Sequence, residues 1–334
     1  MLEHGGRLRQ AAKTYAIALS DWLDLSTGLA PYGWPLPAIP VESWMRLPES
    51  NDGLEEAAKN YYHAANVLPV AGSQAAIQAL PTLFSNRRVG IIEPCYAEHR
   101  RAWSGAGHTV VALNQADVAQ QLHRLDVVVV VNPNNPTGRL IGREVLLQWQ
   151  ETLASKGGHL IVDEAFGDLT PSHSLAAFSD RVGLVVLRSL GKFFGLGGAR
   201  LGFVLAQASL LRTLAENIGP WTVSGPTRLI GTAVLQDTDT QSLWRLRMER
   251  DARRLAELLC RHGLQPAGGC DLFQWTPHDR AFQIHHALAQ RGILTRLFQE
   301  PPALRIGLPH GEAAWSRLEH ALCEVMGEVP QCPR

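Results

Sequence analysis

The sequence predicts an α/β protein, with a mostly parallel sheet covered by helices in a large domain and a smaller α+β domain after it. Three observations support this prediction. Short strands that are apolar on both faces alternate with helical stretches from about Val67 onward. Polar or glycine-rich motifs directly follow several of these strands. After about Gly225 the pattern of expected elements changes, to a long helix followed by a few strands. Strands buried on both faces are typical of parallel sheets that helices cover on each side.

The elements of the large domain follow from the spacing of apolar residues. A Gly72-Ser73 turn opens an apolar helix from Gln74 to about Leu80, and another helix is expected from about Tyr96 to Trp103. Short apolar runs bounded by polar or glycine residues predict strands. These runs are Val89–Ile92, Thr109–Leu113, Asp126–Val131, Leu160–Val162 and Leu184–Leu187.

The remaining parts of the chain have a different pattern. The first 40 residues are rich in Gly and Pro and predict an extended arm. A long helix rich in Arg and Leu is expected from about Gln241 to His262, with strands and further helices after it. The expected strands are Leu272–Thr276, Ile293–Leu297 and Ala303–Ile306. We therefore expect an arm over 1–40 that packs with the small domain, a large domain over 41–225 and a small domain over 226–334.

The composition excludes several classes of partner. The 334 residues include 31 Lys plus Arg and 31 Asp plus Glu, so no charge imbalance points to nucleic acid or to a membrane surface. The five cysteines show no CxxC pair and no metal-ligand spacing, which predicts reduced thiols, no metal and a cytoplasmic location. The N-terminus lacks the apolar segment of a signal peptide, and the longest aliphatic run, Val127–Val131, is too short to span a bilayer.

Chemically distinctive motifs lie where the expected strands end. Asn-Pro-Asn-Asn-Pro-Thr-Gly (132–138) and Asp-Glu-Ala-Phe (163–166) each follow a strand. Arg-Ser-Leu-Gly-Lys (188–192) follows a third strand, and Arg200 lies eight residues beyond the lysine. Because the carboxyl ends of parallel strands meet at one edge of a sheet, these motifs are expected to form one site.

This set of residues matches the needs of pyridoxal 5′-phosphate. The aldehyde of that cofactor forms a Schiff base with a lysine, for which Lys192 is suited. The pyridine nitrogen stays protonated beside a buried carboxylate, here Asp163. Asn135 can donate to the ring oxygen, and Tyr96 can stack on the ring. Donors for the phosphate are expected at the helix start and on the strand ends. They are Gly72, Ser73, Gln74, Ser189 and Arg200.

Each motif has an ordinary alternative when it is taken alone. An isolated Asn-Pro-Thr-Gly is usually a turn, and Tyr96 alone is more often a core aromatic. The glycine-rich run 195–200 is not GxGxxG, and Phe193 follows Lys192 where a P-loop needs Ser or Thr, which excludes two nucleotide sites. Taken together and in order, the motifs between Gly72 and Gly202 resemble the fold-type I pyridoxal-phosphate enzymes of the aspartate aminotransferase superfamily.

Further segments narrow the resemblance. They are His4-Gly5-Gly6, Leu25–Pro31, Pro94–Glu98, Val186–Leu190 and Pro220–Ser224. These segments resemble the L-threonine-O-3-phosphate decarboxylases of cobalamin biosynthesis, with the histidinol-phosphate aminotransferases as a close alternative. Phe166 lies where aminotransferases commonly carry a tyrosine whose hydroxyl donates to the ring oxygen; it either packs beside the ring or has a catalytic meaning.

The resemblance implies a small phosphorylated amino acid as substrate and a homodimer. Arg305 would bind the α-carboxylate of the substrate, and Asn135 would contact the substrate as well as the cofactor. The substrate phosphate would be bound by His4, Gly5, Ser26 and Arg296. Two departures are notable. Leu47 replaces a tyrosine that in relatives reaches the phosphate across the dimer interface, and Gly191 replaces a frequent Ser or Thr.

The implied reaction is loss of the α-carboxylate as carbon dioxide, followed by protonation of Cα, with Lys192 as a plausible proton donor. The product would be (R)-1-amino-2-propanol O-2-phosphate. An aminotransferase would instead break the Cα–H bond, and the motifs alone fit both reactions. A non-catalytic transcription factor with an aminotransferase-like domain is disfavoured, because the chain ahead of Gly72 has no room for a winged helix and linker.

Overall fold

The computed structural model describes residues 4–328. Contacts within the chain define two compact units. Unit 1 contains the residues up to Gly33, Pro136–Gly138 and the residues from Ser242 onward; unit 2 contains Trp34–Asn135 and Arg139–Gln241. The division into an arm, a large domain and a small domain at residues 40 and 225 stays a prediction.

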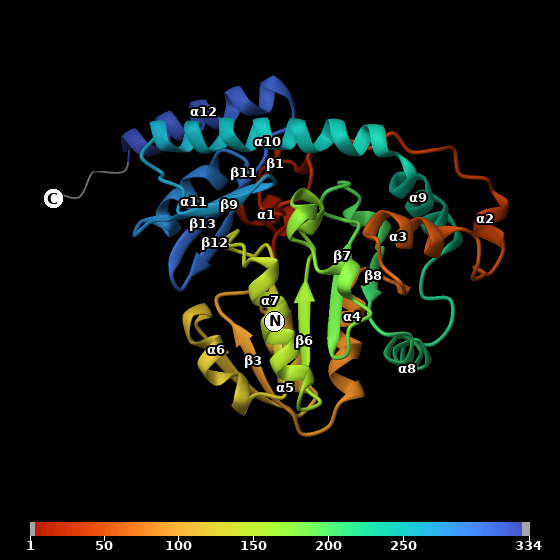
Figure 1. Ribbon diagram of the computed structural model, residues 1–334. Helices are drawn as coiled ribbons and strands as arrows, with labels where there is room; N and C mark the ends of the chain where they lie inside the picture. The colour runs from red at the N-terminus through yellow and green to blue at the C-terminus, as the bar shows by residue number, and fades with distance from the viewer. Residues whose placement is uncertain (1–3, 329–334) are drawn as a thin grey trace. The chain divides into compact units, whose positions relative to one another are not determined.

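Unit 2 is built on a seven-stranded sheet, seen in Figure 1. Its strands are β2 (Val67–Val70), β3 (Arg88–Ile92), β4 (Thr109–Leu113), β5 (Val127–Val131), β6 (His159–Asp163), β7 (Leu184–Ser189) and β8 (Gly202–Leu205). Their order is β2-β8-β7-β6-β5-β3-β4. The pairs from β7 to β4 are parallel, whereas β8 runs antiparallel to both of its neighbours. The expected mostly parallel sheet is therefore confirmed.

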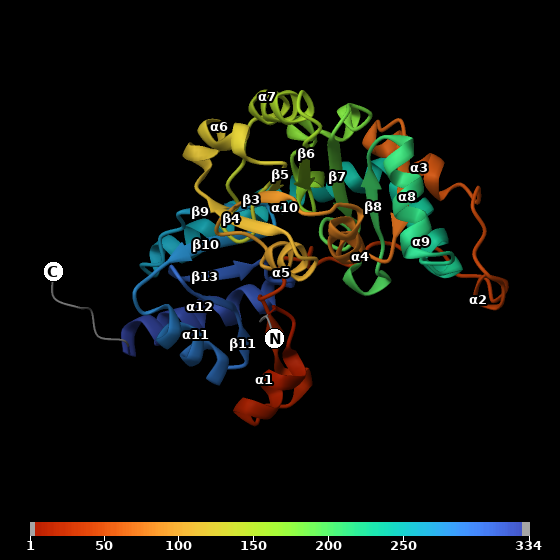
Figure 2. The same ribbon diagram turned by 90° about the horizontal axis from the view of Figure 1, so that it is seen from below.

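Helices cover both faces of this sheet, and Figure 2 shows α4 and α5 on one side with α7 on the other. The helices of unit 2 are α2 (Glu42–Met45), α3 (Leu54–Tyr62), α4 (Ser73–Ala79), α5 (Glu98–Gly105), α6 (Val118–Gln121), α7 (Arg143–Ala154), α8 (Ala208–Ile218) and α9 (Gly225–Gln236). Successive side chains of β5 point to opposite faces of the sheet, and all five are buried, so both faces are covered at this strand. Val127 and Val129 pack in a core cluster with residues of α4, α5 and α8.

The predicted strands of the large domain all occur, with ends that differ by no more than two residues. The sequence patterns did not predict β8, because its four residues lie between the Gly195–Arg200 turn and a helix and carry no alternation. The helix expected from Tyr96 begins at Glu98.

Unit 1 contains a four-stranded antiparallel sheet in the order β12-β13-β10-β9. The strands are β9 (Gly268–Cys270), β10 (Phe273–Pro277), β12 (Arg296–Gln299) and β13 (Pro302–Gly307). The strand expected over Ile293–Leu297 is divided at buried Thr295, since β11 (Ile293–Leu294) pairs in parallel with β1 (Leu23–Asp24) and β12 pairs with β13. The helices are α11 (Ala281–Gln290), α12 (Gly311–Glu328) and most of α10 (Thr238–Arg261).

The expectation of an extended N-terminal arm is wrong for one segment. Leu8–Tyr15 forms a helix, α1, between turns of irregular backbone. A helix of only eight residues is marginal by itself, so tertiary packing must stabilise it. Ala11 of α1 packs in a buried cluster with Trp22, Ala289 and Leu294. This packing depends on α11 and β11, which are distant in sequence.

Two other expectations concern cysteines and membranes. The four cysteines among the described residues are free thiols, whereas Cys332 lies outside those residues. Within residues 4–328, no helix combines the length and the apolar character needed to cross a bilayer.

Candidate active site

The start of α4 and the loop before β8 form a cradle. Gly72 has φ of 74°, a left-handed conformation that favours glycine. A Cβ at Gly72 would lie 2.7 Å from Nη2 of Arg200, and a Cβ at Gly202 would lie 2.5 Å from the backbone nitrogen of Ser73. Both glycines thus allow the Arg200 guanidinium and the β8 backbone to approach the first turn of α4. The structure brings together the predicted phosphate donors at this point.

Tyr96 connects the cradle to α5. Its hydroxyl donates a hydrogen bond to Oε1 of Gln74 at 3.1 Å. Burial, followed by the charges of Glu98 and Asp163, raises the pKa of Tyr96 to about 12, while the charge of Arg200 opposes this shift. The phenol therefore stays neutral and fixed beside the predicted phosphate site, where its ring can serve as a flat surface.

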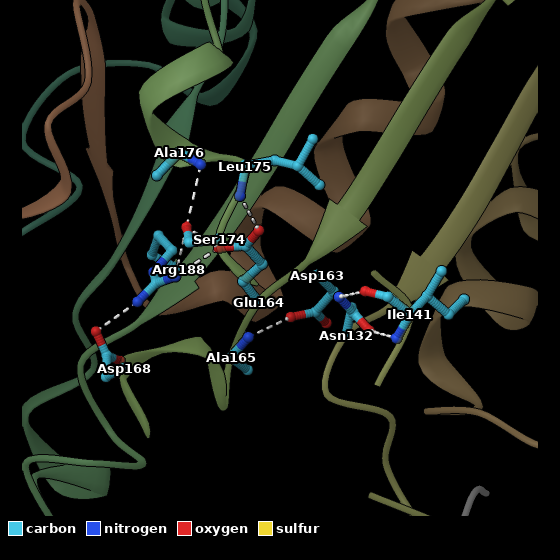
Figure 3. Close-up of polar contacts among 10 residues, drawn as sticks. All are labelled: Asn132, Ile141, Asp163, Glu164, Ala165, Asp168, Ser174, Leu175, Ala176 and Arg188. Carbon is cyan, nitrogen blue, oxygen red and sulfur yellow. Dashed lines mark hydrogen bonds and ion pairs between the residues drawn. The ribbon is translucent and has the colours of Figure 1, made fainter. Parts of the chain in front are cut away.

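Asp163, the last residue of β6, is buried and has a partner on each carboxylate oxygen. The backbone N–H of Ala165 donates to Oδ1 at 3.0 Å, as Figure 3 shows. Nε2 of His99, a buried residue of α5, lies 2.9 Å from Oδ2. The two contacts hold the carboxylate in one orientation, as a group that must meet a ring nitrogen requires.

Lys192 and Phe166 lie beside each other on two strand-end loops. Nζ of Lys192 is 5.4 Å from the centroid of the Phe166 ring, and that ring is buried. Phe166 therefore packs against the lysine and offers no hydroxyl to a cofactor. Ser189, at the end of β7, is also buried and pairs in register with Gly202 of β8.

The loop that carries Asn135 is held by its first residue. Nδ2 of Asn132 donates to the carbonyl oxygen of Ile141 at 3.1 Å, and the N–H of Ile141 donates to Oδ1 of Asn132 at 2.8 Å. Figure 3 shows this closed pair of hydrogen bonds next to Asp163. The buried Asn132 thus has a structural role, and Asn135 stays a predicted donor to the ring oxygen.

A buried ionic network joins the ends of β6 and β7 (Figure 3). Nη1 of Arg188 donates to Glu164 at 2.6 Å, and Nη2 donates to Asp168 at 2.5 Å. All three side chains are buried. Glu164 also accepts hydrogen bonds from Ser174 and from the backbone of Leu175. Because Glu164 adjoins Asp163 and Arg188 adjoins Ser189, the network fixes the predicted site residues of β6 and β7 relative to each other.

An Arg188→Met variant should lose about 3–5 kcal/mol of stability, because two buried carboxylates lose the cation that compensates them. Burial raises the pKa of Glu164, and Arg188 opposes that rise. Without Arg188 the folded-state pKa should rise further above the unfolded value, so the loss should grow as pH increases from about 5 to about 8. Urea unfolding at several pH values measures both effects.

The matched control is Arg181→Met, because Arg181 pairs with Glu151 at the surface. Its loss should stay within about 1 kcal/mol, as for other exposed ion pairs. Equal losses in the two variants would contradict a special role for the buried network.

Unit 1 holds the residues predicted to bind the substrate, with the exception of Asn135, which belongs to unit 2. Arg305, on β13, is buried; its Nη2 donates to the backbone oxygen of Ser26 at 2.7 Å. Burial and then the charge of Arg296, its register partner on β12, lower the pKa of Arg305 to about 10. A bound carboxylate would offset both penalties, because it would pair with the guanidinium and neutralise the local positive charge.

The four residues predicted to bind the substrate phosphate line one pocket of about 280 Å³. They are His4, Gly5, Ser26 and Arg296. The contacts of Ser26 are structural, since its N–H and its hydroxyl both donate to Oδ1 of Asp24 and its Oγ accepts from the N–H of Gly6. A direct donor role of Ser26 toward phosphate stays a prediction.

The sequence patterns did not identify His99 or the Arg188 network. His99 lies one residue after the start of α5, and no motif of the sequence singles it out. Arg188 and Glu164 lie inside the recognised motifs, so their positions were visible but their pairing was not. Such pairing depends on which strands are neighbours.

The residues present fit pyridoxal phosphate. The unit 2 site contains a lysine beside a buried ring, an oriented buried carboxylate, and a guanidinium beside the first turn of a helix. These are the groups that the aldehyde, the pyridine nitrogen and the phosphate of the cofactor require.

Comparisons with known proteins agree with this chemistry. The family model for aminotransferases of class I and II matches residues 45–321. A threonine-phosphate decarboxylase of Pseudomonas aeruginosa is 58% identical over 96% of this chain and 97% of its own length. Another from Sinorhizobium sp is 44% identical over 96% of this chain and 98% of its own.

A solved structure shares the fold. The histidinol-phosphate aminotransferase of Sinorhizobium meliloti, in complex with pyridoxal-5′-phosphate, is similar with a TM-score of 0.82 at 18% identity, covering 98% of each chain. A similarity at 18% sequence identity shows the fold alone. The match of the family model over most of the sequence shows the family. The chain therefore belongs to the aminotransferase class I and II family.

Proposed function

We propose that this protein decarboxylates L-threonine O-3-phosphate with pyridoxal phosphate bound at Lys192, as a step of cobalamin biosynthesis in the cytoplasm. The products would be carbon dioxide and (R)-1-amino-2-propanol O-2-phosphate. The observation that carries this proposal is the near full-length identity, over half of all positions, with a relative named threonine-phosphate decarboxylase. The free thiols of the described cysteines support the location.

The unit 2 residues would hold the cofactor. Arg200 and the N–H groups at the start of α4 bind its phosphate, and Asp163 holds the proton of the ring nitrogen. His99 orients that carboxylate through the 2.9 Å contact. When bound, the cofactor supplies an electron sink for the pair released at Cα. Phe166 excludes water from the ring and leaves the ring oxygen to Asn135.

The chain's own groups would direct which bond breaks. Arg305 binds the α-carboxylate, and the unit 1 pocket binds the phosphate. The Cα–carboxylate bond breaks, carbon dioxide leaves, and Cα takes up one proton, for which the Nζ ammonium of Lys192 is the available donor. Binding energy from the phosphate, which does not react, helps to orient the scissile bond.

Incubation of the protein with L-threonine O-3-phosphate, in the absence of any 2-oxo acid, tests the proposal. Stoichiometric carbon dioxide release is expected. Efficient conversion of histidinol phosphate with 2-oxoglutarate, together with no carbon dioxide release from L-threonine O-3-phosphate, would instead assign the aminotransferase reaction.

The homodimer is part of the proposal, and an exposed apolar segment supports it. Trp44, Met45 and Leu47 are 66%, 79% and 63% exposed. Trp221, which is 61% exposed, lines the same hollow as Pro48. Several large apolar side chains exposed within one short segment are typical of a protein interface. Leu47, which replaces the tyrosine of relatives, would then contribute apolar contact at the interface.

A Met45→Asp variant is expected to shift the protein from dimer to monomer, because it places a charge in the apolar interface. Sedimentation velocity measures the change. Val182→Asp is the matched control, since Val182 is 60% exposed elsewhere in unit 2 and should leave the mass unchanged. A wild-type protein that sediments as a monomer would overturn the proposed dimer.

A further inference from the structure

Arg305, the proposed ligand of the substrate carboxylate, is held by a segment from the other end of the chain. Its Nη2 donates to the backbone oxygen of Ser26 at 2.7 Å, and both residues are buried. The carbon of its guanidinium lies 5.0 Å from the centroid of the Phe273 ring. A guanidinium binds a carboxylate with two parallel hydrogen bonds only when its planar fork is correctly aimed. The aim of Arg305 therefore depends on where the Ser26 carbonyl lies.

Two backbone hydrogen bonds hold the residue before Ser26. The N–H of Leu25 donates to the carbonyl oxygen of Leu294 on β11, and the N–H of Gly307 on β13 donates to the oxygen of Leu25, both at 2.8 Å. A Cβ at Gly307 would lie 3.1 Å from that oxygen, so glycine eases this close approach. Neither bond involves Ser26, so the orientation of its carbonyl is set by other contacts.

Asp24 supplies such contacts. Its Oδ1 accepts from the backbone N–H of Ser26 at 2.9 Å and from the Ser26 hydroxyl at 2.6 Å. A carboxylate that accepts from the N–H two residues later closes a local turn and restricts the backbone between them. The same hydroxyl accepts from the N–H of Gly6 at 2.7 Å. Asp24 thus fixes both the backbone and the side chain of Ser26.

The Ser26 carbonyl is closely packed on its other side. A Cβ at Gly5 would lie 2.3 Å from the carbonyl oxygen, so only a glycine allows this approach. Asp24 also acts on Arg305 by its charge, which opposes the lowering of the Arg305 pKa by burial and by Arg296. Geometry and charge are therefore two separate routes from Asp24 to Arg305.

We propose that Asp24 is a positioning residue for the substrate carboxylate, because the turn that it closes at Ser26 aims the guanidinium of Arg305. This inference rests on the proposed function, in which Arg305 binds the α-carboxylate. Removal of the turn should weaken ligands that carry a carboxylate and spare ligands that lack one.

Two unreactive ligands test this inference in the holoenzyme by calorimetry. The first, 3-phosphoglycerate, has a carboxylate and a phosphate but no amine, so it cannot displace Lys192 from the cofactor. The second, glycerol 3-phosphate, has a hydroxymethyl group in place of the carboxylate. Wild-type protein should bind the first more tightly. In Asp24→Ala the dissociation constant of 3-phosphoglycerate should rise about tenfold, as expected for a misaligned hydrogen bond between charged groups, whereas that of glycerol 3-phosphate should stay unchanged.

Two further substitutions separate geometry from charge. Asp24→Asn keeps an acceptor at the place of Oδ1 and removes the charge, so its affinity for 3-phosphoglycerate should match that of the wild type. Asp24→Glu keeps the charge but moves the acceptor by one methylene group, so it should lose about as much as Asp24→Ala. Asp21→Ala is the matched control, because the Asp21 carboxylate accepts from the exposed hydroxyl of Ser20 at 3.0 Å. Both of its affinities should stay unchanged.

Equal losses for both ligands in Asp24→Ala, or no loss for either, would overturn the inference. Tighter binding of 3-phosphoglycerate by Asp24→Glu than by Asp24→Asn would overturn it as well, and this comparison decides the matter if Asp24→Ala does not fold. A wild-type protein that binds the two ligands equally would show that Arg305 does not select a carboxylate, which also refutes the inference. Calorimetry requires no turnover, so a protein that binds as expected but releases no carbon dioxide would refute the proposed function alone.

Discussion

A Lys192→Ala variant is expected to fold normally and to lose at least about 10³-fold in decarboxylation, because it removes both the covalent attachment and the proton donor. The chain has only four lysines, namely Lys13, Lys59, Lys156 and Lys192. Borohydride reduction of the wild-type protein should therefore attach the cofactor to a single, easily mapped peptide. The variant should show no attachment.

Two other lysines serve as controls for this experiment. Lys156 donates to the carbonyl oxygens of Leu122 and Leu125, so its amine is already bound, and Lys13 is exposed on α1. Lys13→Ala should retain full activity and full labelling. Labelling at any lysine other than Lys192 would refute the assignment of the cofactor site.

The second large effect is expected for Asp163→Asn. The amide keeps the size of the side chain but removes the charge, and an opposite charge within about 4–6 Å stabilises a protonated group by about one to three pKa units. Turnover should therefore fall by about 10- to 1,000-fold while the unfolding midpoint changes little. Stopped-flow and steady-state measurements of kcat give the size of the loss.

His99 provides the comparison for Asp163→Asn. His99→Phe leaves the charge of Asp163 in place and removes only the 2.9 Å contact that orients it. Its turnover should fall by less than that of Asp163→Asn, because the charge remains and only its orientation is less constrained. If Asp163→Asn retains near-normal kcat, Asp163 is not the partner of the ring nitrogen.

The amino-acid sequence was sufficient for the parallel strands of the sheet and for the order of the chemical groups that follow them. Apolar runs that are buried on both faces specify parallel strands, and the polar residues that follow them have to lie at one edge of the sheet. Asp163 and Ser189 could therefore be placed from their covalent position at the ends of β6 and β7. Lys192 and Arg200 followed from their spacing within the same motif.

The tertiary structure decided which of these groups are partners. His99 meets Asp163 across 64 positions of sequence, and Arg188 meets Glu164 across 24. The pocket that contains His4 also contains His285 and Arg296, from the other end of the chain. The helix α1 exists where the sequence indicated an extended arm, because its apolar residues pack against α11 and β11. Local patterns specify which face of an element is apolar, but the partner of that face depends on non-local packing, which no sequence period records.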